Sequence, residues 1–162
     1  MLRISLRAGL MMQAVLVSAV LLGALGSEWW GGLVPCALCL VGRWPYRVAI
    51  GFALLGLVVP RRFVMACAAG VVLAMLGSAA IGVVHVGVEG KLWPSPLPGC
   101  VARFTPGAGI ADLPARPAKP CDDPTYLISG LPVSMAAMNL IFSLGSVAAM
   151  AAVMVRNRSR QR

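Results

Sequence analysis

The sequence predicts an all-α protein, a membrane four-helix bundle with both termini in the cytoplasm. Hydrophobic residues make up 59% of the 162 residues and charged residues only 12%, which is more apolar than a typical soluble domain. The apolar residues form four long blocks, and basic residues flank these blocks. We therefore expect a single integral membrane domain over residues 1–162.

Each of the four blocks is long enough to cross a bilayer. A spanning helix needs about 20 mostly apolar residues, and we expect spans at about 8–27, 40–59, 63–86 and 132–155. Pro60 ends the second helix, and the arginines after it anchor a tight link. The first block also resembles a cleavable signal peptide, but it exceeds the usual about 7–15 apolar residues, which favours a retained helix.

The placement of the basic residues predicts the orientation. Eight of the fourteen lysines and arginines lie near the chain ends or in the link after Pro60, with no acidic residue among them: Arg3, Arg7, Arg61, Arg62, Arg156, Arg158, Arg160 and Arg162. Such residues mark cytoplasmic flanks. The net charge of +9 could also suit nucleic acid. Because topology already explains the charge, we expect a lipid bilayer and no nucleic acid as a partner.

Two loops are then expected outside the cytoplasm, at about 28–39 and 87–131. The first carries no basic residue, and in the second four basic residues are balanced by four acidic ones: Lys91, Arg103, Arg116 and Lys119 against Glu89, Asp112, Asp122 and Asp123. Eight of the twelve prolines fall between Pro94 and Pro124. Such a segment cannot form regular helix or sheet, and we expect it to be extended and mobile.

This topology divides the five cysteines between the two outer loops and the third span. Cys36 and Cys39 lie in the first outer loop, and Cys100 and Cys121 in the second. Cys67 lies near the cytoplasmic end of the third span, roughly 25 Å from the others along the helix, and is expected to be a small buried hydrophobic residue.

The outer cysteines form two pairs in unlike settings. Cys36-Ala37-Leu38-Cys39 is a CxxC motif, which permits a short-loop disulfide and often lowers one thiol pKa, although the same spacing begins zinc sites. Haem attachment is disfavoured because Leu40 stands where the motif requires histidine. For Cys100 and Cys121 we consider three roles, which are thiol–disulfide exchange, a purely structural disulfide and a metal site. We favour exchange because the proline-rich segment has little core for a structural disulfide to stabilise.

Two arginines follow the CxxC motif into the second span. From Tyr46 to Val59 the chain covers only about 21 Å as a helix, so the span must begin near Leu40 and include Arg43 and Arg47. Cys39 and these arginines then follow an i, i+4, i+8 stripe. A guanidinium there can stabilise a thiolate and donate hydrogen bonds to a carbonyl ligand. We favour this role for Arg43, and a headgroup anchor for Arg47.

These residues resemble the DsbB family of quinone-dependent disulfide-generating membrane proteins. Pro35-Cys36-Ala37-Leu38-Cys39 with Arg43-Trp44-Pro45-Tyr46 is similar to the family's CxLC motif and the arginine after it. Leu92-Trp93-Pro94-Ser95-Pro96 before Cys100 is similar to the approach to the second loop. Cys121-Asp122, and Gly130 through Ser134-Met135-Ala136 to Asn139, resemble that loop's exit. Gly42 departs from the family, where glutamine or glutamate is common.

The resemblance implies roles for all four outer cysteines. Cys100–Cys121 would be the disulfide that meets a DsbA-like periplasmic thioredoxin-fold protein, with Cys100 forming the mixed disulfide. Cys121 would relay electrons to Cys36. Cys39 would face a quinone, ubiquinone or menaquinone, drawn from the membrane pool and positioned by Arg43. The implied location is the bacterial inner membrane.

Residues near the expected quinone have further candidate roles. His85 could bind the quinone, although a lone histidine at a helix end is more often an interfacial polar group. Glu89 and Trp93 are expected to anchor the interface, with proton transfer a further role for Glu89. For Met135 and Met138 we expect ordinary helix packing rather than contact with a ligand.

Two alternatives remain. One is a non-enzymatic membrane protein whose outer cysteines staple the loops or bind zinc. The absence of a histidine beside either pair in the sequence weakens the zinc version, so no metal ligand is predicted. The other alternative resembles the vitamin K epoxide reductases, whose CxxC normally follows a late span rather than the first.

Overall fold

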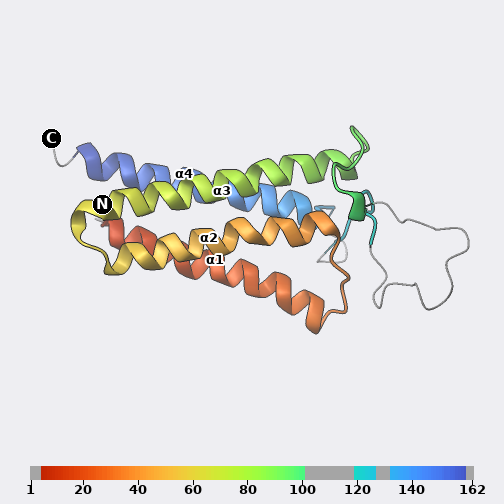
Figure 1. Ribbon diagram of the computed structural model, residues 1–162, viewed down its shortest axis with the longest axis horizontal. Coiled ribbons are helices and arrows are strands. Elements are labelled where there is room, and N and C mark those ends of the chain that lie inside the picture. Colours follow the sequence, from red (N-terminus) through yellow and green to blue (C-terminus); the bar gives the residue numbers. More distant parts are fainter. Residues whose placement is uncertain (1–4, 101–118, 127–131, 160–162) are drawn as a thin grey trace, which may run out of the picture.

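A computed structural model describes residues 5–100, 119–126 and 132–159, and in these ranges it is an all-α four-helix bundle (Figure 1). The helices are α1 (Leu6–Trp29), α2 (Ala37–Val58), α3 (Arg61–Glu89) and α4 (Met135–Ser159), and a single 3-10 turn, η1, covers Pro98–Cys100. All four helices are long and apolar enough to cross a membrane. The shortest has 22 residues, or about 33 Å at 1.5 Å per residue.

The link between α2 and α3 lies at one end of the bundle, near the start of α1 and the end of α4, while the start of α2, the end of α3 and η1 lie at the other end (Figure 1). α3 packs against both α2 and α4, and α1 packs mainly against α2. The arginines at 3, 160 and 162, Gly130, and the proline-rich part of the second loop at 101–118 lie outside the described residues.

The helix ends differ from the expected spans in ways that matter for the cysteines. α2 begins at Ala37, three residues before the expected span, because Cys36 caps the helix and its side chain accepts a hydrogen bond from the Cys39 amide. α3 continues to Glu89 rather than 86. Cys39, His85 and Glu89 are therefore all carried on helices, at the same end of the bundle.

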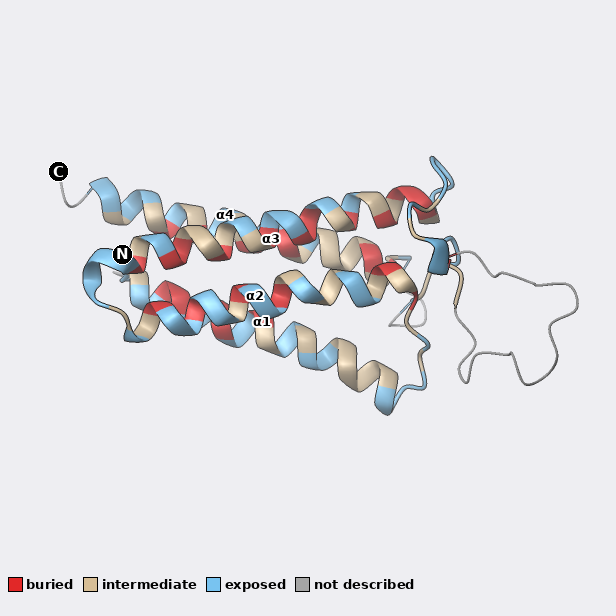
Figure 2. Ribbon diagram, in the orientation of Figure 1, coloured by how far each residue is buried: buried red, intermediate tan, exposed pale blue. Residues whose placement is uncertain are grey.

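The exposure of the side chains follows the pattern expected of a membrane protein. Buried positions run along the inward faces of the helices, while exposed positions face outward (Figure 2). The buried core contains Leu10, Val17, Val71, Met75 and Met150. Large apolar side chains such as Leu73 and Ile141 point outward and are about two-thirds exposed. An apolar exterior of this extent requires a lipid environment.

The interior also holds two groups of polar side chains that satisfy one another. Gln13 of α1 donates to the carbonyl of Ser146 in α4 over 3.0 Å and accepts from its hydroxyl over 2.8 Å. Tyr46 of α2 and Ser78 of α3 both donate to the amide oxygen of Asn139 in α4. Among the described residues no buried side-chain nitrogen or oxygen lacks a partner, as a low-dielectric interior requires.

Candidate redox site

The CxxC motif forms the first turn of α2. Cys36 is 5% exposed, and its Sγ lies 3.0 Å from the Sγ of Cys39. Both are free thiols. The Cys39 amide donates to the Cys36 sulfur over 3.3 Å, so a helix N-terminus points at Cys36. This setting favours a thiolate there.

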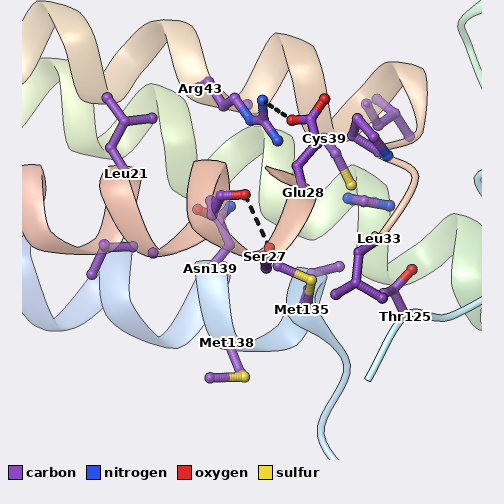
Figure 3. A pocket seen from close by; sticks show the side chains of 18 of the residues that line it. Leu21, Ser27, Glu28, Leu33, Cys39, Arg43, Thr125, Met135, Met138 and Asn139 are labelled. Atoms are coloured by element: carbon purple, nitrogen blue, oxygen red, sulfur yellow. Dashed lines mark hydrogen bonds and ion pairs between the residues drawn. The ribbon is translucent and has the colours of Figure 1, made fainter. Parts of the chain in front are cut away.

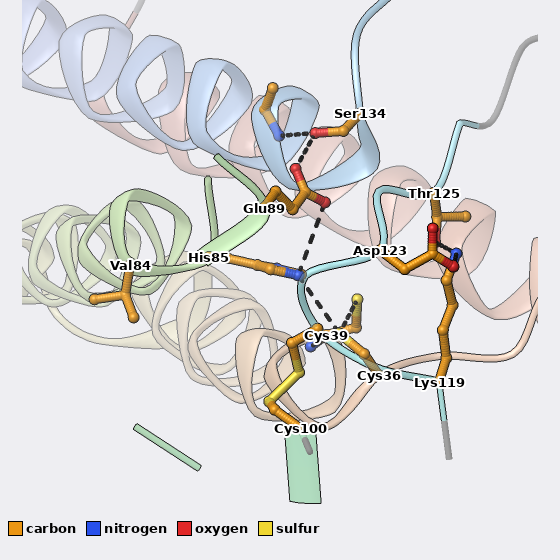
Figure 4. A network of polar contacts seen from close by, with 12 residues as sticks. Cys36, Cys39, Val84, His85, Glu89, Cys100, Lys119, Asp123, Thr125 and Ser134 are labelled. Carbon is orange, nitrogen blue, oxygen red and sulfur yellow. Dashed lines mark hydrogen bonds and ion pairs between the residues drawn. A yellow bond between two sulfur atoms is a disulfide. The ribbon is translucent and has the colours of Figure 1, made fainter. Parts of the chain in front are cut away.

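His85 connects the motif to α3. Its Nε2 lies 3.5 Å from the Sγ of Cys36, although 49 residues separate the two in sequence. The same nitrogen lies 3.9 Å from the carboxylate of Glu89, one helical turn away on α3. That carboxylate accepts a hydrogen bond from Ser134 just before α4 (Figure 4). A chain of polar contacts therefore runs from α2 through α3 to the start of α4.

These contacts lower the pKa of the Cys36 thiol from its ordinary value near 9 to about 4. The hydrogen bond with the Cys39 side chain is the largest cause. Burial acts in the opposite direction, and the contact with His85 lowers the pKa further. At neutral pH Cys36 in the reduced pair is therefore a thiolate.

The second cysteine pair is joined in a disulfide between Cys100 and Cys121. Cys100 ends the turn η1, and its carbonyl accepts from the Cys121 amide over 3.2 Å. Cys36 pairs with Lys119 in an isolated parallel bridge. As a result Cys36 shares one buried cluster with both cysteines of the disulfide (Figure 4), the proximity that exchange between the two pairs requires.

Cys39 faces a different environment, a cavity of about 350 Å³ at this end of the bundle (Figure 3). Cys36 is not among its lining residues, whereas Cys39, Arg43 and His85 are. The rest of the lining is mainly apolar and comes from α1, α2, α3, α4 and the segments beside them. It includes Leu21, Leu33, Ile81, Met135, Met138 and Phe142. A mostly apolar cavity with few polar groups is typical of a small-molecule site.

The two arginines of α2 lie in different environments. Arg43 lines the cavity and donates to Glu28 near the end of α1 over 2.8 Å, with its side chain 13% exposed. Arg47 is exposed, and its guanidinium lies 5.1 Å from the centre of the Trp44 ring. The expected stripe therefore brings Cys39 and Arg43 to the cavity lining but not Arg47, for which the headgroup anchor stays a prediction.

Three features of the site were missed or misjudged from sequence. Glu28 was not singled out, because its pairing with Arg43 depends on how α1 and α2 meet. Met135 and Met138 line the cavity, a placement that was not expected from sequence, while helix packing rather than contact with a ligand stays a prediction for them. The argument against zinc from the absence of a neighbouring histidine holds only along the sequence, since the fold places His85 beside Cys36 and Cys39, with the three donor atoms within 4.8 Å of one another.

Cys67 and Trp93 are two further residues with roles expected from the sequence. Cys67 is buried near the start of α3, far along the helix from His85. Trp93 is folded back on α3, where its indole nitrogen donates to the Val84 carbonyl over 3.1 Å. A Cβ on Gly87 would clash with the Trp93 ring, so glycine is needed for this contact.

Comparison with known proteins points to one family. A family model described as disulfide bond formation protein DsbB matches residues 6–153, which is most of the chain. No curated protein and no solved structure matches the chain. The family implies disulfide bond formation by an oxidoreductase that acts on disulfides, and the four membrane-spanning helices and two cysteine pairs fit that activity. The chain therefore belongs to the DsbB family of multi-pass membrane proteins.

Proposed function

We propose that this protein is a quinone-dependent thiol oxidase of the bacterial inner membrane that reoxidises a DsbA-like periplasmic protein. One observation carries the proposal. Cys36 is packed with the Cys100–Cys121 disulfide, whereas its partner Cys39 lines an apolar cavity beside Arg43. A CxxC pair that contacts a second disulfide on one side and a lipophilic site on the other can pass electrons between them.

The proposed sequence of exchanges uses the four cysteines in turn. A thiolate of the periplasmic partner attacks Cys100, which forms the mixed disulfide and releases Cys121 as a thiolate. Cys121 then attacks Cys36 of the oxidised Cys36–Cys39 pair and releases Cys39. Each step exchanges one disulfide for another through thiolate attack. The partner's second thiol then attacks the mixed disulfide and releases Cys100, which attacks Cys121 and displaces Cys36. The low pKa of Cys36 suits it as this leaving group, and the Cys36–Cys39 pair is left as a dithiol.

The residues around the cavity fit a quinone. The apolar lining accommodates a lipid-soluble ring, and Arg43 and Asn139 supply polar side chains that can face carbonyl oxygens. When bound, a quinone would supply the two-electron acceptor that a strongly oxidising DsbA-like partner requires. Because the reduction potential of such a partner is about −120 mV, only an acceptor of higher potential can reoxidise it.

The proposed orientation places the two cysteine-bearing loops in the periplasm and the α2–α3 link in the cytoplasm. The basic residues support it, since Arg61 and Arg62 open α3 and Arg156 and Arg158 lie in the last turn of α4. An oxidising compartment is also where a disulfide between Cys100 and Cys121 would persist.

A turnover assay tests the proposal. Purified protein in detergent is mixed with ubiquinone or menaquinone and a reduced DsbA-like protein, and quinone absorbance is followed. We expect turnover by the wild type, none by Cys39→Ser, and unchanged turnover by Cys67→Ser, because Cys67 lies outside the site. The proposal is wrong if neither the wild type nor Cys39→Ser reduces quinone while the Cys100–Cys121 disulfide stays intact. That outcome would mean that the disulfide is purely structural.

A further inference from the structure

The thiols of the CxxC motif and the His85 imidazole form a compact set of donor atoms. Cys36 and Cys39 come from the first turn of α2, while His85 comes from α3. Their sulfur and nitrogen atoms all lie within 4.8 Å of one another. Cys36 and His85 are about 5% and 6% exposed, so the donors are held by packing on two different helices.

The spacing of these atoms is close to a tetrahedral zinc site. Zinc binds thiolate at about 2.3 Å and imidazole at about 2.0–2.1 Å, which places a sulfur and a nitrogen about 3.5 Å apart on a tetrahedral edge. The observed separation of Cys36 Sγ and His85 Nε2 is 3.5 Å. The two sulfurs, now 3.0 Å apart, would separate to about 3.8 Å. A rotation of the partly exposed Cys39 side chain can provide this.

A carboxylate that could serve as a fourth donor lies beside His85. The Glu89 carboxylate is 3.9 Å from His85 Nε2 and is held in place by the Ser134 hydroxyl. Carboxylate oxygen is an accepted zinc ligand beside thiolate and imidazole. Two sulfurs, one nitrogen and one oxygen suit the borderline-soft Zn²⁺ better than a hard cation such as Mg²⁺.

We propose that the reduced Cys36–Cys39 pair, His85 and Glu89 form a zinc-binding site that exists only while the pair is a dithiol. Binding releases the thiol protons that remain, since zinc takes thiolates. The disulfide form of the pair offers neither thiolate, so the oxidised protein has no site for the ion.

A consequence for activity rests on the proposed function. Zinc bound here would hold Cys36 and Cys39 as metal thiolates, so that the pair could not pass its two electrons to a quinone in the cavity. The ion would therefore act as a reversible inhibitor that captures the reduced enzyme and leaves the oxidised enzyme untouched.

Metal binding can be measured without turnover. Full-length protein carrying Cys100→Ala and Cys121→Ala is reduced anaerobically with a phosphine and titrated with Co²⁺, whose thiolate charge-transfer bands report sulfur ligation, and then with Zn²⁺ as competitor. We expect one ion per chain, none on the oxidised protein, and unchanged binding by Cys67→Ser. His85→Ala and Glu89→Gln should each weaken binding by about tenfold or more.

The outcomes separate the two proposals. Failure of the reduced protein to bind, or an affinity that His85→Ala leaves unchanged in the same Cys100→Ala, Cys121→Ala background, would overturn the zinc site even if quinone turnover is normal. Binding that depends on His85 supports the site even if the turnover assay fails. A folded control is provided by the oxidised protein, since it is the same polypeptide and differs only at the two sulfurs.

Discussion

Arg43 of α2 and Glu28 of α1 form an ion pair of 2.8 Å in the lining of the cavity that Cys39 faces. Both side chains are mostly buried, at 13% and 16% exposed. The pair joins the C-terminal end of α1 to α2 and holds the guanidinium in the cavity lining that includes Cys39. It therefore has both a structural and an electrostatic role.

Removal of either partner of this pair should destabilise the protein. Arg43→Met and Glu28→Gln should each lower the free energy of unfolding by about 1–3 kcal/mol, less than for a fully buried pair, because each breaks a mostly buried ion pair. The double variant should be more stable than the sum of the single effects predicts. Thermal unfolding in detergent measures this.

A matched control for the ion pair lies one turn along the same helix. Arg47 is exposed, and Arg47→Met should change stability by less than about 0.5 kcal/mol. Strictly additive effects of Arg43→Met and Glu28→Gln would show that the two side chains do not stabilise each other.

The pKa of Cys36 should appear in its reactivity. In the reduced protein, alkylation of Cys36 should rise with pH around a midpoint of about 4 and be constant at neutral pH, because a lowered pKa leaves the thiolate present at every higher pH. Cys39→Ala removes the largest cause of the lowering and should shift the midpoint upward. Peptide mass spectrometry after brief iodoacetamide pulses measures the rate at each pH.

His85 provides a second measurement on the same thiol. Its contact is a smaller cause of the lowered pKa than the Cys39 hydrogen bond, so His85→Leu should raise the midpoint by less than Cys39→Ala does. A wild-type midpoint near the ordinary value of 9 would show that neither side chain stabilises the thiolate.

The sequence was sufficient for the bundle but only partly for the site. Four apolar blocks separated by turns leave little choice of fold, and the CxxC motif and Arg43 lie close together in the chain. The contact between Cys36 and His85 joins positions 49 residues apart, and it depends on the rotation of α3 against α2. Local periodicity does not determine that rotation, since α3 is apolar on all sides and lacks a dominant face.

Gly87 offers a test of how the second loop is attached to α3. A Cβ at this position would overlap the ring of Trp93, so Gly87→Ala should displace the indole and break its hydrogen bond to Val84. We expect a loss of about 1–3 kcal/mol from this overpacking, measured by thermal unfolding, together with a change in Trp fluorescence. Gly77→Ala in the same helix meets no atom within 4 Å and should be neutral or slightly stabilising. Equal effects of both substitutions would contradict the assigned contact.

The hydrogen bonds between Gln13 and Ser146 should hold α1 against α4, where the two helices pack less extensively than α2 and α3 do. Ser146→Ala removes one bond and leaves the Gln13 side-chain oxygen without its hydroxyl donor. Interhelical hydrogen bonds in membranes contribute about 0.6 kcal/mol on average and about 1.7 at most, and we expect a loss of stability near the upper value because both side chains are buried. Denaturant unfolding in mixed micelles measures it. Ser159→Ala is the control, since that exposed hydroxyl bonds only to carbonyls of its own helix. A loss no larger than that of Ser159→Ala would mean that apolar packing alone positions α1.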